Sequence, residues 1–300
     1  MENYDFDVSV IVIMYNSDKR KLFQTLDSIL VQINISFEVI ICDDGSKIRL
    51  DKEILSYFST KYFNAYSLIF HDLNNGTVSN CCSGLEKAKG KYTKIISPGD
   101  SFANESALYE WIKYLERQRL QWSFSDSYFY YYGKEGRKII SKRAVPQIIY
   151  PYINNQQEKS RWNYLVLGDI PVGAAILGTT QIQLTYCKIL KEKGVCYTED
   201  NAYRLMMFDG IVGGYYSKPT IYYEYGTGIS TSKEKLWKKR LLIDKKITYH
   251  IMSEKDNLSS FQKTLIKAES CNNMIGKFFV RGKLFHCVKW HLFQRLTPIP

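Results

Sequence analysis

Short apolar runs and segments of helical periodicity alternate along the first hundred residues. Val8 to Met14 is an almost unbroken run of apolar, mostly β-branched residues, and Phe37 to Cys42 is a second run of this kind. Between them, Lys19 to Val31 carries its apolar residues at the spacing of an amphipathic helix. The pattern therefore predicts a β-α-β unit at the beginning of the chain.

The alternation continues through the next fifty residues. It predicts a helix around Ile54 to Phe58, a strand at Tyr66 to Phe70, a helix from about Thr77 to Lys87 and a strand at Tyr92 to Ile96. Strands that alternate with helices in this way form a parallel sheet that is covered on both faces. We therefore expect an α/β fold with a doubly wound, Rossmann-like sheet.

The second part of the chain is less regular. The pattern predicts a helix from Asn104 to about Arg119, then a strand from Trp122 to Tyr132 that ends in a hairpin turn at 133–136. Apolar strands and helices resume from Pro171 to Tyr223. From about Lys233 the chain is expected to be helical.

The net charge of +11 lies almost entirely in the last quarter of the chain. Residues 233–300 contain 15 Lys and Arg against 5 Asp and Glu. We therefore divide the chain into a globular region at 1–230, with halves at 1–103 and 104–230, and a basic helical region at 231–300. A basic tail suits a nucleic acid, an acidic membrane surface or a solvated helix face.

The N-terminus shows no pattern for export or membrane insertion. The apolar run from Val8 to Met14 is far shorter than the roughly 20 residues that a membrane-spanning helix needs, and no basic segment precedes it. The seven cysteines show neither a CxxC pair nor the Cys/His spacing of a zinc site. We expect buried, reduced cysteines and a cytoplasmic protein.

Two adjacent acids follow one of the predicted strands. Asp43 and Asp44 precede Gly45 and Ser46, directly after the run that ends at Cys42. A carboxylate at the tip of a strand can accept a hydrogen bond from N3–H of uracil or from a ribose hydroxyl. The alternative is a tight Asp-Gly turn with no ligand.

A second acid ends the strand at 92–96. Ser97, Pro98 and Gly99 lead to Asp100, and the carboxyl ends of parallel strands gather at one edge of the sheet. A hard divalent cation held by such a carboxylate would neutralise a leaving diphosphate. The alternative is an acid at a helix N-terminus after a Pro-Gly turn.

Together these residues resemble the family 2 glycosyltransferases of the GT-A fold. Val8 to Asn16, Leu26 to Gln32, Asp43 to Ser46 and Asn75 to Tyr92 are similar, in order and spacing, to four motifs of that family. The resemblance implies a mixed GT-A sheet flanked by helices. It also implies transfer of a sugar from a nucleotide sugar, with a UDP-sugar as the expected donor.

The resemblance also assigns roles to individual residues. Tyr15 would contact the base, Asp43 and Asp44 would hold the nucleoside, and Asp100 would hold Mn2+ or Mg2+ against the diphosphate, with Ser97 beside it. Many family members have several acids where this chain has one carboxylate. Water and the diphosphate would complete the coordination, so we expect weak metal affinity without donor.

Thr198-Glu199-Asp200 resembles the Glu-Asp motif at which the family places its catalytic base. An inverting transferase needs a carboxylate that takes the proton of the acceptor hydroxyl as its oxygen attacks the anomeric carbon. Asp200 is the expected base, and Glu199 serves instead if the local register differs. A capped helix start with acids in its first turn is compatible with either role.

Two further segments have weaker signals. Pro171 to Ile176 resembles the small-residue strand that lines the acceptor side in this family, although by composition it is only a buried strand. Tyr225 to Thr231 is rich in glycine and hydroxyl groups, so its backbone N–H groups could close over a diphosphate. An ordinary connection explains that segment equally well.

Residues 275–296 interleave aromatic and aliphatic residues with Lys and Arg. Such a segment can lie in the interface of an anionic membrane, where an undecaprenyl-diphosphate-linked acceptor would be found. A helix packed on the catalytic region is the alternative. The chain shows no helix-turn-helix, zinc or RNA-binding signature, so we expect no nucleic-acid partner.

The sequence thus predicts an inverting, metal-dependent glycosyltransferase that extends a glycan or lipid-linked acceptor of a bacterial capsule or O-antigen, in the cytoplasm or at the inner face of the membrane. A nucleotidyltransferase would need a glycine-rich phosphate loop after the first strand, and Tyr15 to Asp18 contain no glycine. A catalytically silent nucleotide-sugar-binding protein of the same fold is the other alternative. Gly99 favours it, whereas Asp100 and Asp200 argue against it.

Overall fold

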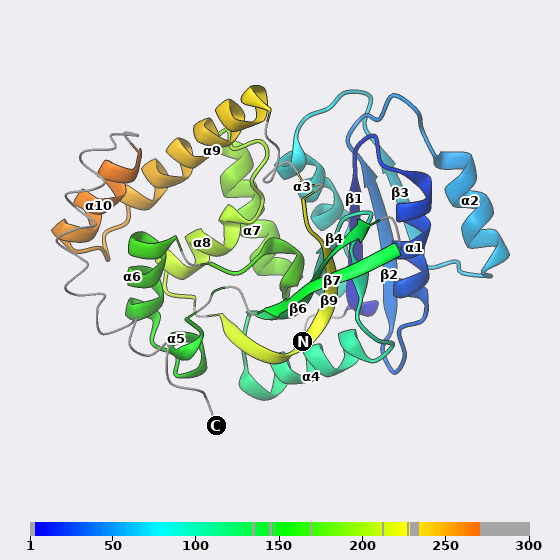
Figure 1. Ribbon diagram of the computed structural model, residues 1–300, viewed down its shortest axis with the longest axis horizontal. Coiled ribbons are helices and arrows are strands. Elements are labelled where there is room, and N and C mark those ends of the chain that lie inside the picture. Colours follow the sequence, from blue (N-terminus) through cyan, green and yellow to red (C-terminus); the bar gives the residue numbers. More distant parts are fainter. Residues whose placement is uncertain are drawn as a thin grey trace.

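The computed structural model describes residues 4–133, 136–143, 146, 148–168, 170–211, 213–226, 228 and 234–270. The N-terminal half contains the elements β1 (Phe6–Met14), α1 (Lys19–Leu30), β2 (Phe37–Asp43), α2 (Asp51–Thr60), β3 (Tyr66–Phe70), α3 (Thr77–Lys87), β4 (Gly90–Ile96), β5 (Ser101–Phe102) and α4 (Ala107–Gln118). These follow the predicted alternation closely. In Figure 1, β1 to β3, α1 and α2 lie at the right in shades of blue, and α4 lies at the bottom.

The second half is built mainly from helices and from long strands, of which β6 and β9 pair in parallel and β6 and β7 pair antiparallel. Its elements are β6 (Trp122–Gly133), β7 (Gly136–Arg143), α5 (Tyr150–Ile153), α6 (Gln157–Leu167), the 3-10 turn η1 (Gly173–Ala175), β8 (Ile176–Thr179), α7 (Thr180–Glu192), α8 (Asn201–Phe208), β9 (Gly214–Glu224), α9 (Lys235–Ser253) and α10 (Ser260–Ser270). In Figure 1 the helices α5 to α10 lie together on the left.

One mixed sheet runs through both halves. Its strand order is β3-β2-β1-β4-β8-β6-β9-β5, and β7 pairs with β6 outside this path. β3, β2, β1 and β4 are mutually parallel, whereas β8 is antiparallel to both β4 and β6. The expected parallel, doubly wound sheet is therefore confirmed for the first half, and the mixed sheet is confirmed for the whole.

The apolar runs are continuous because the central strands are buried on both faces. Ile11 and Ile13 of β1 belong to a core cluster with the apolar residues of α3, α7 and α8. Val10 and Val12, on the other face, belong to a second cluster with those of α1, α2 and α4. The four cysteines Cys42, Cys81, Cys82 and Cys187 are buried as predicted, whereas Cys196 is half-buried.

Two local predictions need correction. Pro171 to Ile176 is not one buried strand, because Gly173 to Ala175 form a 3-10 turn in which the N–H of Ala175 donates to the carbonyl of Val172 at 3.0 Å. Because the 3-10 turn occupies residues 173–175, the strand begins only at Ile176. The helices α5 and α6 are an addition, since no element was predicted there.

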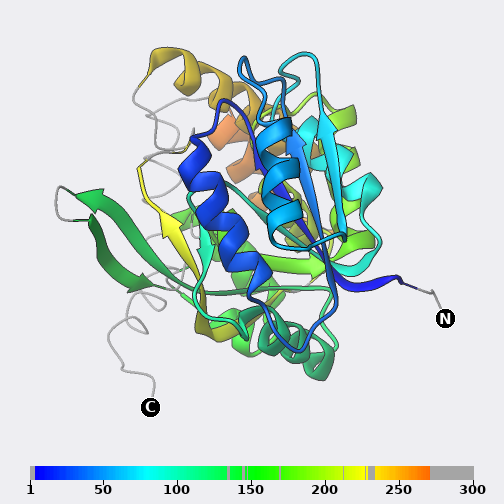
Figure 2. The same cartoon turned by 90° about the vertical axis from the view of Figure 1, so that its right-hand side faces the viewer.

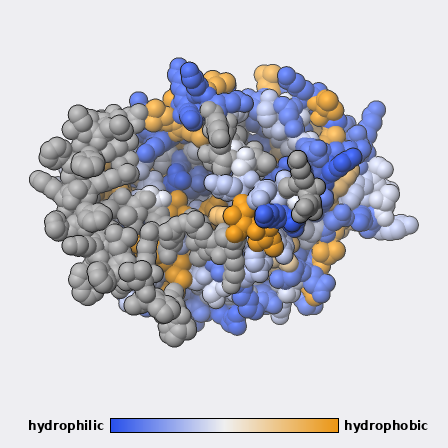
Figure 3. Space-filling model, in the orientation of Figure 1, coloured by the Kyte–Doolittle hydropathy of each residue, from blue (hydrophilic) through white to orange (hydrophobic). Residues whose placement is uncertain are grey.

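The hairpin of β6 and β7 confirms the turn expected at 133–136, because Gly133 and Gly136 are paired. Figure 2 shows the hairpin extending away from the body of the molecule. Ile139 and Ile140 on β7 are each 51% exposed. Figure 3 shows an apolar patch where β7 runs, on a face that is otherwise largely polar among its coloured residues.

The basic region is helical over the part that the structure describes, at α9 and α10. The segment 275–296, for which membrane contact was considered, lies outside the described residues. Among the helices that are described, none has the length and apolarity needed to traverse a bilayer.

Candidate active site

A pocket of about 410 Å³ opens at the carboxyl ends of β1, β2 and β4. The loops that follow these three strands all contribute residues to the pocket, as expected for a doubly wound sheet. The predicted site residues that line it are Tyr15, Asp44, Ser97, Asp100, Glu199 and Asp200. The pocket therefore brings together the proposed donor-side and acceptor-side groups, and its volume suits a small-molecule ligand.

Asp44 is presented to the pocket by the loop after β2. Its carboxylate accepts hydrogen bonds from the backbone N–H groups of Asn75 at 2.8 Å and Gly76 at 2.9 Å. Burial raises the pKa of Asp44, and these two hydrogen bonds act against that rise. Tyr15 lies at the same pocket with 42% of its surface exposed. Its ring is thus free to pack on a base.

Asp43 has a different position from Asp44. It is 1% exposed and lies outside the pocket lining. Its Oδ1 accepts the backbone N–H of Ser46 at 2.7 Å, and the Ser46 hydroxyl oxygen accepts the N–H of Asn16 at 2.6 Å. Gly45 provides the positive φ of 75° that this turn requires. The structure therefore gives Asp43 a place in shaping the loop, and Asp44 alone of the two faces the pocket.

Asp100 is held from both sides at the end of β4. Its Oδ1 accepts the backbone N–H of Glu224 at 3.0 Å, and its carbonyl oxygen accepts the Thr25 hydroxyl at 2.7 Å. Burial raises the pKa of Asp100 to about 7. The carboxylate is 6% exposed and reaches the pocket, so it is fixed before any ligand arrives.

A lysine lies buried near Asp100. Lys94 is fully buried on β4, and its ammonium donates to the carbonyl oxygens of Ile95 at 2.6 Å and Ala174 at 2.7 Å. Burial lowers the pKa of Lys94 to about 7, and the charge of Asp100 acts in the opposite direction. No role was predicted for Lys94 from the sequence. A cation within an apolar strand was the available signal.

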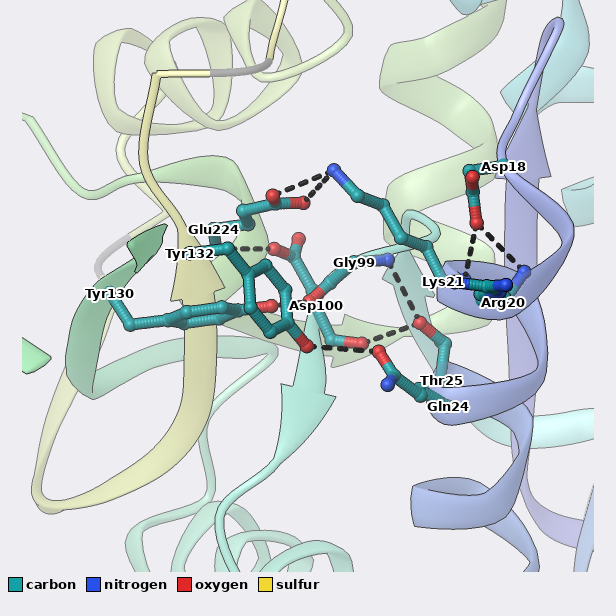
Figure 4. Close-up of polar contacts among 10 residues, drawn as sticks. All are labelled: Asp18, Arg20, Lys21, Gln24, Thr25, Gly99, Asp100, Tyr130, Tyr132 and Glu224. Carbon is teal, nitrogen blue, oxygen red and sulfur yellow. Dashed lines mark hydrogen bonds and ion pairs between the residues drawn. The ribbon is translucent and has the colours of Figure 1, made fainter. Parts of the chain in front are cut away.

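Glu224, at the end of β9, is a pocket residue that the sequence analysis missed. Its two oxygens accept hydrogen bonds from the Lys21 ammonium at 2.7 and 2.8 Å. Figure 4 shows Lys21 reaching from α1 toward Glu224, with Asp100 and Gly99 beside the pair. A Cβ atom at Gly99 would collide with Oε2 of Glu224. The position of Glu224 between a strand and a glycine-rich loop was the sequence signal that could have indicated a role for it.

Glu199 and Asp200 lie together on the loop between α7 and α8. Oδ2 of Asp200 pairs with Nη2 of Arg204 at 3.2 Å. Burial, and then the charge of Asp200, raise the pKa of Glu199 to about 8. Gly173 packs closely against this loop, because a Cβ there would lie only 3.3 Å from Cβ of Asp200.

The loop that carries these acids is tied to α9. The backbone N–H groups of Cys196 and Tyr197 donate to the carboxylate of Asp244 at 3.1 and 2.6 Å. Trp237 and Leu241 of the same helix line the pocket. The division at residue 230 stays a prediction, but α9 contributes directly to the walls of the site.

The described pocket lining is strongly acidic. It contains the five carboxylic acids Asp44, Asp100, Glu199, Asp200 and Glu224, and neither Lys nor Arg. Within the described ranges, no three His, Cys, Asp or Glu side chains form a cluster that could hold a metal ion. Of the loop at 225–231, Gly228 lines the pocket, whereas residues 227 and 229–231 lie outside the described residues.

Solved structures with a similar fold have been determined with nucleotide sugars. TarS of S. aureus in complex with UDP-GlcNAc matches with a TM-score of 0.61 and 18% identity, over 94% of this chain and 75% of that one. The mannosyltransferase PcManGT of Pyrobaculum calidifontis, in complex with GDP-Man and Mn2+, matches with a TM-score of 0.58 and 14% identity, over 100% of this chain and 80% of that one. At these identities the likeness concerns the fold.

Sequence relatives and a family model give closer information. Two proteins described as uncharacterized glycosyltransferases, from Rickettsia felis and Rickettsia bellii, are each 28% identical, over 49% and 46% of this chain. The matched part spans only 24% and 19% of their lengths. The family model described as glycosyl transferase family 2 matches residues 9–177, more than half of the chain. The chain therefore belongs to glycosyl transferase family 2.

Proposed function

We propose that this protein transfers a sugar from a nucleotide sugar, with a UDP-sugar as donor, to an acceptor hydroxyl with inversion at the anomeric carbon. The observation that carries this proposal is the joining of donor-side and acceptor-side acids in one pocket. Asp44 and Asp100 lie at the tips of β2 and β4, and Glu199 and Asp200 approach from the loop before α8. The fold-level likeness to proteins that bind UDP-GlcNAc and GDP-Man supports a donor of this class.

The nucleoside end is assigned to the loops after β1 and β2. The Asp44 carboxylate, oriented by two backbone N–H groups, is an acceptor for N3–H of a pyrimidine. Tyr15 lies at the same edge with an exposed ring. Asp43 acts indirectly here, because it supports the turn that presents Asp44. Its expected direct contact with the nucleoside thus becomes a positioning role.

The acidity of the pocket supports a requirement for a divalent cation. A diphosphate is an anion, and no Lys or Arg belongs to the described lining that it would meet. Asp100 provides a hard oxygen ligand of the kind that Mn2+ and Mg2+ prefer, and these ions commonly use one or two carboxylates with phosphate oxygens. Such a cation, when bound, would neutralise the charge that develops on the leaving diphosphate.

The chemical step is then assigned to the acceptor side. The Asp200 carboxylate takes the proton of the acceptor hydroxyl while that oxygen bonds to the anomeric carbon, and the bond from that carbon to the diphosphate oxygen breaks. The products are the glycoside, the nucleoside diphosphate and protonated Asp200. A donor with an α-linked sugar would give a β linkage. Arg204 holds Asp200 in place through their ion pair.

A panel of sugar nucleotides tests this proposal. We expect one donor to release nucleoside diphosphate slowly by hydrolysis with Mn2+, and to lose that turnover with EDTA or after Asp100→Ala. Glu110→Gln is the control, because Glu110 binds Lys218 at 2.7 Å outside the pocket lining and should leave turnover unchanged. If no donor binds or turns over with metal, even with lipid-linked acceptor extracts, a silent binding protein becomes the better description.

The acceptor is proposed to be a growing glycan or a lipid-linked intermediate of a bacterial surface polysaccharide, such as a capsule or O-antigen. Family membership and the predicted amphipathic segment at 275–296 support this choice. Incubating the protein with a labelled donor and undecaprenyl-diphosphate-linked oligosaccharides would give a labelled lipid product. Label that appears only in water-soluble glycans would contradict the lipid-linked acceptor.

A further inference from the structure

The carboxylate of Glu224 fills the space toward which a side chain at position 99 would point. Gly99 has a φ of +108°, and a Cβ atom on it would collide with Oε2 of Glu224. Gly99 immediately precedes Asp100, in the loop that the sequence analysis found short of acids. The acidic group missing from this loop is therefore supplied in space by β9, a strand from the other half of the chain.

Glu224 and Asp100 are fixed to each other as well as to the pocket. The backbone N–H of Glu224 donates to Oδ1 of Asp100 at 3.0 Å, in a buried contact between residues 124 positions apart. Each residue is 6% exposed, and both line the pocket. Two carboxylic acids thus meet the same part of the pocket, and their side chains lie next to each other in Figure 4.

The partner of Glu224 is a lysine in an unfavourable place on its own helix. Lys19, Arg20 and Lys21 form the first turn of α1, which contains no acid, although the positive end of the helix dipole disfavours cations there. The Lys21 ammonium nevertheless reaches both oxygens of Glu224. Its side chain is 31% exposed, so the ammonium can withdraw into water along its flexible stem.

Building on the proposed function, we propose that Glu224 is a second carboxylate ligand of the divalent cation, with Asp100 as the first. Lys21 is the counter-ion of Glu224 when the cation is absent, and it leaves when the cation binds. Two carboxylates and the oxygens of a diphosphate form a ligand set that suits Mn2+ or Mg2+. The exchange replaces the single positive charge of Lys21 by the double positive charge of the cation, next to the carboxylates of Asp100 and Glu224.

Binding of Mn2+ to the full chain tests this assignment without any turnover. The Kd of Mn2+ would be measured by electron paramagnetic resonance, with and without saturating UDP, for wild type, Glu224→Gln, Lys21→Met and Asp209→Asn. Asp209 is a matched control, because Lys255 contacts both of its oxygens at 2.6 and 2.7 Å outside the pocket lining. Circular dichroism would establish that each variant is folded.

We expect Glu224→Gln to raise the Kd of Mn2+ in the presence of UDP at least about tenfold, since loss of a group that merely orients a metal ligand already costs 10–100-fold. Lys21→Met should lower this Kd, because a competing cation is removed, and Asp209→Asn should leave it unchanged. The Lys21 variant also keeps the assignment testable if Glu224→Gln does not fold.

Unchanged Mn2+ affinity in Glu224→Gln would overturn the assignment, and so would weaker Mn2+ binding in Lys21→Met. Absence of Mn2+ binding to wild type, with or without UDP, would overturn it as well. These results differ from failure of the proposed function, in which UDP does not bind wild type in either Mn2+ or EDTA. In that case, the titration with Mn2+ alone still compares Glu224→Gln with wild type.

Discussion

Glu199 and Asp200, on the loop between α7 and α8, should differ in how their replacement by the neutral amide affects turnover. Asp200→Asn removes the proposed base, whereas Glu199→Gln replaces a group that is mostly uncharged. Burial and the charge of Asp200 raise the pKa of Glu199 to about 8, so its carboxyl group is mostly protonated at pH 7. A glutamine amide resembles that protonated carboxyl in shape and lack of charge. Glu199→Gln should therefore retain most of the turnover at pH 7.

The loss in Asp200→Asn follows from the contribution of a positioned base. General base catalysis contributes typically about 10²–10⁴-fold, which corresponds to roughly 3–5 kcal/mol at 1.36 kcal/mol per decade. The same change also weakens the ion pair with Arg204. Arg204→Met is the control for that contact, because it removes the pair and keeps the carboxylate. It should cost less turnover than Asp200→Asn.

The measurement is kcat for transfer to an acceptor, or for donor hydrolysis, from pH 6 to 9 in all four proteins. Urea unfolding of each variant would separate loss of the base from loss of folded protein. The reasoning would be refuted if Glu199→Gln abolished turnover and Asp200→Asn retained it. In that case wild-type kcat should rise about tenfold per pH unit up to about pH 8, because Glu199 itself would then have to ionise.

Three further changes have expected outcomes. Gly99→Ala should lower the free energy of unfolding by roughly 1–3 kcal/mol in urea titrations, because φ is +108° and the new Cβ meets Glu224; an unchanged value would mean that the loop relaxes freely. Lys94 binds a proton less readily in the folded protein, with a pKa of about 7 against 10.5, so the unfolded chain holds more protons at this residue between these values and its contribution to the free energy of unfolding should rise from pH 7.5 to 9.5. Lys94→Met removes this contribution, so the free energy of unfolding of wild type minus that of the variant should rise with pH in urea titrations, and equal pH slopes of the two proteins would contradict the assignment. Asp44→Asn should raise the Kd of UDP, measured by calorimetry, roughly 10–100-fold, as expected for a hydrogen bond to a charged group. Unchanged affinity would mean that the uracil ring binds elsewhere.

Periodicity predicted the first half of the fold well because burial there has a simple pattern. β1 and β2 are central strands between two apolar clusters, so nearly every residue from Val8 to Met14 had to be apolar. The helix at 19–30 is equally plain, with Asp18 as its N-cap and Leu22, Leu26 and Ile29 buried. The strand tips then located Asp44 and Asp100 in one pocket.

The rest of the site depends on contacts between distant residues, which local patterns do not contain. Lys21 and Glu224 are 203 positions apart, and either alone is an ordinary surface-type residue. The different positions of Asp43 and Asp44 depend on which way each carboxylate turns after β2. The 3-10 turn at 173–175 packs closely against the loop that carries Asp200, and the glycine at position 173 permits this contact.

The loop at residues 196–198 is hydrogen-bonded to Asp244 of α9, and the carbonyl oxygen of Cys196 also accepts the N–H of Val78, at the start of α3, at 2.9 Å. Asp44 and Asp100 follow the parallel strands β2 and β4, whereas Glu199 and Asp200 lie on the loop that is hydrogen-bonded to α9. A substitution along α9 that moves this loop can therefore act on both sides of the pocket, because α3 begins directly after Asn75 and Gly76, whose N–H groups hold Asp44.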